Sequence, residues 1–101
     1  MQMARARNIK PGFFLNTDLS EISAIGRLLF IGLWTIADYR GCLQYNPKKI
    51  KAQILPYEDG INTEQLINDL ERYGFIRKYI IDDDEYIKIV NFEKHQSPHK
   101  N

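Results

Sequence analysis

The apolar segment over residues 24–39 restricts the fold of this chain more than any other feature of its sequence. Apolar residues recur in it at the three- and four-residue spacing of an α-helix, and further apolar residues stand outside that face. The first face comprises Ile25, Leu28, Leu29, Gly32, Leu33 and Ile36, and the residues outside it are Phe30, Ile31 and Trp34. Ser23 can cap this helix and Gly41 can stop it. A helix that is apolar on nearly all sides is buried or is covered by a second chain, so we expect it at the centre of the domain.

Shorter elements follow this central helix, and the hydrophobic period changes after Gly74. We predict a short strand over 41–45, a helix over 48–54 opened by Asn46 and Pro47, a helix over 63–73 capped by Asn62 or Thr63, and strands over 75–81 and 85–92. The polar run Asp82, Asp83 and Asp84 predicts a tight turn that joins the last two strands into a β-hairpin. Residues 18–22 predict a single helical turn, capped by Asn16 or Thr17, before the central helix.

This order of elements predicts an α+β fold, the winged helix-turn-helix, with three main helices, a short strand and a C-terminal β-hairpin as the wing. We expect residues 1–22 to form an N-terminal arm with a short helical turn. Residues 23–93 are predicted to form the winged-helix domain, and residues 94–101 a flexible basic tail.

Composition excludes several other classes of protein. With 101 residues, 44% hydrophobic and 27% charged, the chain has the size and balance of one small globular domain. Its longest apolar stretch, residues 28–34, is much shorter than the ~18 residues that a membrane span needs. The single cysteine, Cys42, suits a reducing compartment. We therefore expect a cytoplasmic protein with no membrane partner.

Patterns typical of catalysis are lacking from the sequence. It has no Gly-rich phosphate loop, no GxSxG turn and no HExxH pair. Cys42 has no histidine near it in the sequence, and we interpret it as a small buried hydrophobe. His95 and His99 are four residues apart, but Pro98 lies between them and no third ligand is near. We expect a protein that is not an enzyme and that holds neither a metal nor a cofactor.

Basic residues suited to contacts with a DNA backbone occur in three segments, although the formal net charge is only +1. Lys and Arg neutralise phosphates, and an N-terminal arm can follow the backbone or enter a minor groove. The candidates are Arg5, Arg7 and Lys10 in the arm, Lys48, Lys49 and Lys51 in the second helix, and Lys94, His95, His99 and Lys100 in the tail. The alternative for the Lys-rich helix is an ordinary solvated face.

The third helix is the one that contacts base edges in a helix-turn-helix protein. It carries Gln65, Asn68 and Arg72, and such amides pair with adenine while Arg pairs with guanine. Acidic residues on the same helix and at the hairpin tip repel phosphate. We therefore expect contacts mainly to the DNA backbone, with little base specificity.

Phe30, Ile31 and Trp34 add more apolar surface than three short helices and a hairpin need. One interpretation is that Phe13 and Phe14 fold back and cover them. The other is that these five residues form a surface for self-association or for a protein partner.

Four segments also resemble a phage and prophage protein family, namely residues 5–14 (RARNIKPGFF), 27–34 (RLLFIGLW), 50–52 (IKA) and 91–99 (NFEKHQSPH). That family is similar to the N-terminal winged-helix domain of DnaD-like replication-initiation proteins. The resemblance implies a role in starting phage DNA replication in a bacterial host, through DNA binding and recruitment of a helicase or its loader. The basic positions that match the family's motifs are Arg5, Arg7, Lys10, Lys51, Lys94, His95 and His99. It also implies that such N-terminal domains can serve mainly for self-association.

Three functions follow as hypotheses. The first is a DNA-binding module of a phage replication initiator, with single-stranded or duplex DNA and a replicative helicase or helicase loader as partners. The second is an oligomerisation or adaptor module that forms protein contacts, including homo-oligomers, in the replication complex without binding DNA itself. The third is a small transcriptional regulator, which requires a dimer and a third helix able to contact bases.

Overall fold

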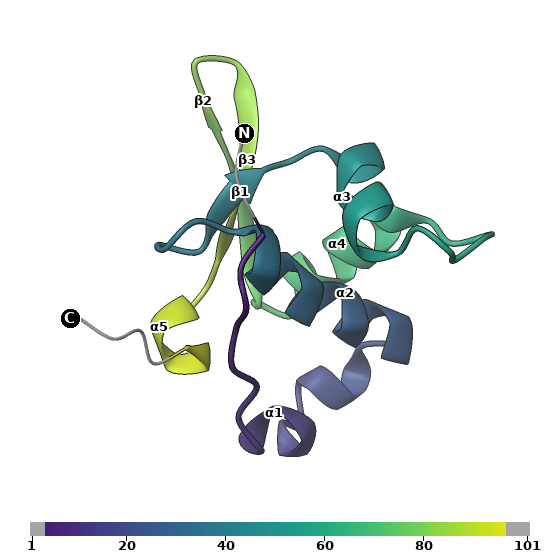
Figure 1. The fold of residues 1–101 in the computed structure, drawn as a ribbon, viewed down its shortest axis with the longest axis vertical. Coiled ribbons are helices and arrows are strands. Elements are labelled where there is room, and N and C mark those ends of the chain that lie inside the picture. The colour runs from purple at the N-terminus through teal and green to yellow at the C-terminus, as the bar shows by residue number, and fades with distance from the viewer. Residues whose placement is uncertain (1–3, 97–101) are drawn as a thin grey trace.

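A computed structural model of the chain describes residues 4–96. Its elements in order are α1 (Gly12–Leu15), the 3-10 turn η1 (Leu19–Glu21), α2 (Ala24–Ile36), β1 (Cys42–Gln44), α3 (Pro47–Ile54), α4 (Thr63–Arg72), β2 (Ile76–Ile81), β3 (Asp84–Ile89) and α5 (Phe92–His95). Figure 1 shows α2 in the middle, with α3 and α4 to one side and the β2–β3 hairpin projecting away from the helices. The predicted α+β class is confirmed.

The three strands form one antiparallel sheet in the order β1-β3-β2. The predicted hairpin is present, but its second strand begins at Asp84 and ends at Ile89 rather than covering 85–92. Asp82 and Asp83 have φ values of 50° and 70°, so the loop contains only these two residues and Asp84 pairs directly with Ile81.

The predicted central helix is confirmed by the burial of α2. Leu29, Phe30 and Leu33 are 0% exposed, and Trp34 is 1% exposed. Gly32 allows α3 to approach α2 closely, because a Cβ at this position would clash with the side chain of Ile54. The strands share this core, because Ile76, Ile87 and Ile89 belong to the same buried cluster as the residues of α2.

The helix α2 ends at Ile36, three residues before the predicted end at Tyr39. The chain turns there because the Asp38 carboxylate accepts the backbone N–H groups of Arg40 and Cys42, each at 2.9 Å. Gly41 serves this turn at φ 84° and does not stop the helix directly. A Cβ at Gly41 would lie 2.8 Å from Phe92, so the turn also packs against α5.

The predicted N-caps of α2, α3 and α4 are confirmed. Ser23 accepts the backbone N–H of Gly26 at 3.0 Å, and Asn46 accepts that of Lys49 at 3.1 Å. At the start of α4 the cap is Asn62, not Thr63. The helical turn predicted at residues 18–22 is η1, whose N-cap position is Asp18 and not Asn16 or Thr17. The Asn16 side chain nevertheless accepts the backbone N–H groups of Asp18 and Leu19, at 2.9 and 3.0 Å.

Both ends of the described chain pack onto the domain. Leu19 and Ile22, which lie in the predicted arm, are 1% and 3% exposed and belong to the same core as α2. The arm runs beside α2 (Figure 1), and the backbone of Asn8 exchanges two hydrogen bonds with the Gln96 side chain. The helices α1 and α5 were not predicted. Among residues 4–96, no helix combines the length and the apolar character needed to cross a membrane.

Candidate nucleic-acid interface

The structure turns Arg7, a predicted DNA contact, toward the interior. Its guanidinium donates to the carbonyl of Trp34 at 2.9 Å and to that of Ala37 at 3.1 Å, at the C-terminal end of α2. The same group lies 5.0 Å from the centre of the Phe92 ring. Burial, with a smaller contribution from the nearby Arg5 charge, lowers the pKa of Arg7. The Arg7 side chain thus links the arm to α2 and α5. Its donors satisfy backbone carbonyls that have no hydrogen-bond partner within α2, because they lie at the C-terminal end of the helix.

The other two arm residues lie on the surface. Arg5 is exposed, and its backbone N–H donates to the carbonyl of Thr35 at 2.8 Å. Lys10 is exposed two residues before the start of α1. Because the arm is fastened at residues 5, 7 and 8, it does not extend away from the domain, as a segment entering a minor groove does.

The three predicted lysines of α3 divide into two kinds. Lys48 and Lys49 are exposed in the first turn of the helix. Lys51 is half-buried, and its ammonium donates to the carbonyl of Leu55 at 3.3 Å, just beyond the end of the helix. The first two lysines are therefore available to a phosphate, whereas the third stabilises the C-terminus of its own helix.

A cavity of about 530 Å³ opens between the N-terminal turns of α3 and α4. We call it the interhelix pocket; it is lined by Asn46, Pro47, Lys48, Lys51, Ile61, Asn62, Thr63 and Glu64. Helix N-termini carry partial positive charge, which favours anions. The hydroxyl of Thr63 is buried there without a hydrogen-bond partner among the described residues, and Thr63 as a whole is 7% exposed. The Glu64 carboxylate opposes anion binding at one wall.

The predicted base-contacting residues of α4 are largely engaged within the domain. The Gln65 amide donates to Asp69 at 2.9 Å, and the Asn68 carbonyl accepts from the Lys78 ammonium at 2.8 Å. Arg72 is exposed, with its guanidinium 5.9 Å from the centre of the Tyr73 ring. Two of the three side chains would have to break a contact before they could pair with a base.

The predicted tail sites are not placed by the structure. The side chains of Lys94 and His95, together with His99 and Lys100, lie outside the described residues. Among the residues that are described, no group of three or more His, Cys, Asp or Glu side chains is arranged to hold a metal ion.

The apolar set that suggested a protein contact is mostly internal. Phe13 stacks on Phe30 with ring centres 6.4 Å apart and meets Trp34 edge-on at 5.7 Å. Phe30 and Trp34 are thereby closed off, and Ile31 is half-buried. Phe14 does not help to cover them, because 74% of its surface is exposed. Of the five predicted residues, Phe14 alone remains as a large exposed contact.

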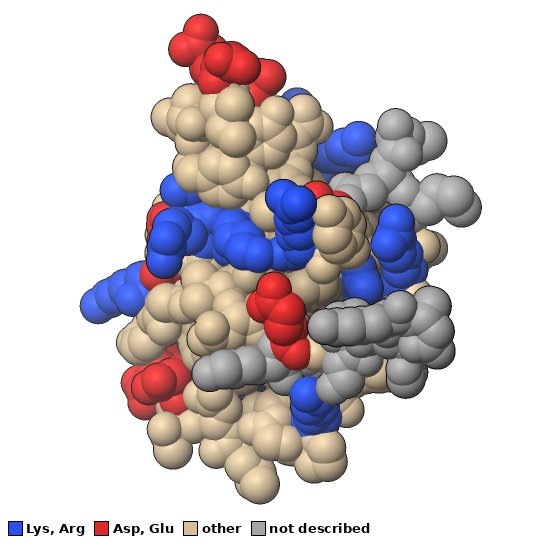
Figure 2. Space-filling model, turned by 90° about the vertical axis from the view of Figure 1, so that its left-hand side faces the viewer, with Lys and Arg blue, Asp and Glu red and all other residues tan. Residues whose placement is uncertain are grey.

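Sequence reasoning missed the outer face of the sheet. In the register, Arg77 pairs with Lys88, and Tyr79 pairs with Tyr86, and directly paired residues point to the same side of a sheet. The other side is buried, with Ile87 and Ile89 at 0% exposure. Figure 2 shows basic side chains in a band across one side of the molecule, below the acidic hairpin tip. The alternation of residues 86–89, Tyr-Ile-Lys-Ile, is the pattern that could have revealed this face.

No protein-family model matches the chain, and no curated protein or solved structure matches it significantly.

Proposed function

We propose that this chain is a winged-helix DNA-binding module that contacts mainly the DNA backbone. The element order and the sheet order β1-β3-β2 support this fold, with α3 and α4 as the helix pair and β2–β3 as the wing. The resemblance to DnaD-like initiators supports placing the module in phage replication initiation, beside a helicase or its loader. The observation that carries the proposal is the interhelix pocket. The exposed Lys48 lines this pocket, and the exposed Lys49 is the next residue of α3.

Three properties of this pocket fit a phosphate. Two helix N-termini face it, and their partial positive charges add to that of Lys48. The unpartnered Thr63 hydroxyl can donate to an anionic oxygen. The engaged amides of α4 and the neighbouring carboxylates argue against base contacts. Backbone binding without strong sequence preference follows from this arrangement.

The test is fluorescence anisotropy with a labelled duplex oligonucleotide at low and moderate salt. We expect the double variant Lys48→Glu with Lys49→Glu to weaken binding at least 10-fold and to reduce the salt slope by about two units. Glu64→Gln is the matched control with opposite sign, because it removes a negative charge from the same pocket and should tighten binding two- to threefold. Unchanged affinity in the double variant would remove α3 from the interface.

A base-contacting role for α4 is tested separately with Arg72→Gln. Affinity for unrelated duplexes should change by less than twofold, because the residue lies away from the pocket lining. A large loss on one sequence only would instead support the transcriptional regulator.

A specific observation also keeps the adaptor function as a second candidate. Phe14 and Leu15 in α1 are 74% and 81% exposed, and none of the residues of α1 is buried. Adjacent exposed apolar side chains of this size favour a protein contact. Sedimentation velocity over a range of concentrations tests this. Self-association that disappears in Phe14→Ser with Leu15→Ser supports the adaptor, and a monomer at all concentrations argues against homo-oligomers.

A further inference from the structure

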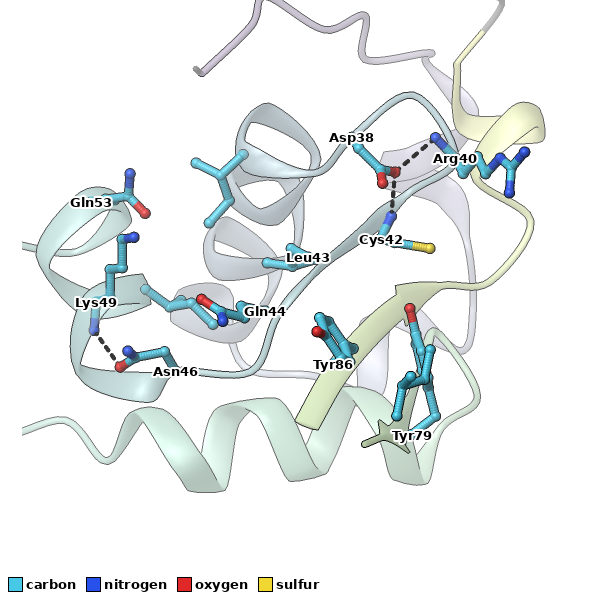
Figure 3. A pocket seen from close by; sticks show the side chains of 13 residues that line it. Asp38, Arg40, Cys42, Leu43, Gln44, Asn46, Lys49, Gln53, Tyr79 and Tyr86 are labelled. Atoms are coloured by element: carbon cyan, nitrogen blue, oxygen red, sulfur yellow. Dashed lines mark hydrogen bonds between the residues drawn. The ribbon is translucent and has the colours of Figure 1, made fainter. Parts of the chain in front are cut away.

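The outer face of the sheet carries a second surface, separate from the interhelix pocket. A cavity of about 450 Å³ lies there, open to solvent and bounded by the hairpin, β1, the turn before β1 and α3. We call it the sheet groove. Tyr79, Tyr86 and Gln44 come to it from the sheet, Arg40 from the turn and Lys49 from α3 (Figure 3). Its volume lies within the range of specific ligand sites.

Two tyrosines form the floor of the sheet groove. The rings of Tyr79 and Tyr86 are stacked, with centres 5.5 Å apart and planes inclined by 24°. Figure 3 shows the two rings standing side by side from the hairpin. Both residues are half-buried, so part of each ring remains accessible. A side-chain hydrogen bond with Cys42, together with burial, raises the pKa of Tyr79 to about 12.

Cations surround this aromatic floor. Arg77 and Lys88 form the neighbouring cross-strand row on the same face, because Lys88 pairs with Arg77 on one side and Cys42 on the other. The Lys88 ammonium donates to the backbone carbonyl of Arg40. This hydrogen bond places the turn, with the exposed side chain of Arg40, beside this row. Lys49 stands on the opposite wall.

Few carboxylates are available in the sheet groove to repel an anion. Asp38 contributes the single carboxylate among the described lining residues, and it accepts the N–H groups of Arg40 and Cys42. The three aspartates of the hairpin tip gather at its far end, beyond the tan surface that separates them from the basic band in Figure 2. A polyanion crossing the band avoids the tip, whereas a long stiff duplex lying along the hairpin meets it.

We propose that the sheet groove binds single-stranded DNA, with bases stacking on Tyr79 and Tyr86 and phosphates meeting Arg77, Arg40 and Lys49. The reason for a single strand is that base faces are accessible only when the bases are not stacked within a duplex. Aromatic side chains flanked by cations are the arrangement that proteins use for sequence-tolerant binding of single strands. The choice of DNA over RNA rests on the function proposed above, whereas the stacking surface itself does not.

The experiment compares a fluorescein-labelled dT12 strand with the dT12·dA12 duplex in anisotropy titrations. We expect Tyr79→Leu and Tyr86→Leu each to weaken binding of the single strand roughly 10-fold, and Tyr79→Phe and Tyr86→Phe to retain it because they keep the ring. Arg77→Gln should reduce the salt slope by about 0.7 for the single strand. Tyr57→Leu is the matched control, because Tyr57 is 91% exposed and lies outside the groove.

A crossed comparison separates the failure of the two proposals. Lys48 lines the interhelix pocket but not the sheet groove, so Lys48→Glu should weaken duplex binding and leave dT12 binding within twofold. If the Leu variants bind dT12 like the unaltered protein, the groove proposal is wrong even when the Lys48 result stands. Tighter binding of an rU12 strand than of dT12 would overturn the assignment to DNA.

NMR chemical-shift mapping on the unaltered protein tests the proposal even if a Leu variant fails to fold. On adding dT12, amide shifts should concentrate at Tyr79, Tyr86 and Lys88. Shifts confined to the start of α3 and α4 would overturn the sheet groove as the single-strand site.

Discussion

The basic residues of this domain fall into an inward and an outward group that the sequence does not distinguish. The side chains of the inward group donate hydrogen bonds within the domain. Arg7 donates to carbonyls at the end of α2, Lys51 donates to the carbonyl of Leu55, and Lys78 donates to the Asn68 side chain. The outward group, with Lys48, Lys49, Arg72 and Arg77, is exposed. A Lys or Arg therefore indicates a nucleic-acid contact only when the fold leaves its charged group to solvent. Substitutions in the inward group should reduce stability, whereas those at Lys48, Lys49 and Arg77 in the outward group should reduce binding.

The largest effect is expected for Arg7→Ala. It removes charged hydrogen bonds to carbonyls at the end of α2 and the contact with the Phe92 ring, so we expect a loss of about 2 kcal/mol and a fall in Tm of roughly 10 °C. Thermal and urea unfolding measure it. Arg5→Ala is the matched control and should stay within about 0.5 kcal/mol. An Arg7→Ala protein of normal stability with weakened DNA binding would move Arg7 to the outward group.

The next effect is expected for Lys78→Met. Its ammonium bonds Asn68, lies 3.7 Å from the Glu71 carboxylate and stands 5.2 Å from the centre of the Tyr45 ring. Losing these partly exposed contacts should reduce the free energy of unfolding by about 1 kcal/mol. The substitution also releases Asn68. If DNA affinity then rises on particular sequences, α4 is a base-contacting helix after all. Arg77→Met, on the outer face of the same strand, should leave stability unchanged.

A smaller effect is expected for Lys51→Gln, because its single hydrogen bond caps the end of α3 near the surface. We expect a loss of about 0.5 kcal/mol in urea unfolding. Lys49→Gln, two residues earlier in the same helix, should leave unfolding unchanged and weaken DNA binding instead. Equal effects of the two substitutions on DNA binding would show that Lys51 and Lys49 do not belong to different groups.

The smallest effect at neutral pH concerns Tyr79, whose hydroxyl ionises only in strong base. The folded state raises its pKa to about 12 from an ordinary value of 10, so it holds the proton more firmly than the unfolded chain does. Its contribution to stability is therefore complete below pH 10 and is lost as the pH rises from about 10 to about 12. Absorbance at 295 nm should show a phenolate transition near pH 12 that is missing in Tyr79→Phe. A transition at pH 10 would show that the bond to Cys42 does not form.

Local sequence signals predicted most of the elements. Asn46 and Asn62 cap helices where expected, because a cap depends on a side chain and backbone groups only three residues away. The errors lie at the ends of the elements. The helix α2 stops at Ile36 because the Asp38 carboxylate organises a turn, and α5 forms where Phe92, 2% exposed, enters the core.

The candidate sites were predicted less well than the fold. The sequence pointed to Lys48 and Lys49, and the structure leaves both exposed. It also pointed to Arg7 and to the amides of α4, which the structure engages internally. It did not point to Tyr79 and Tyr86, which are seven residues apart and meet only because the hairpin register pairs them.

The sequence by itself determined the helix and strand order, the caps and the central place of the segment around Trp34, because these follow from local hydrogen bonding and hydrophobic periodicity. Only the tertiary structure decided which charges remain on the surface. That outcome depends on carbonyls, rings and side chains brought together from distant parts of the chain, as when Arg7 meets Ala37 and Phe92. The same long-range packing places the interhelix pocket between two helix starts and sets Tyr79 beside Tyr86 in the sheet groove.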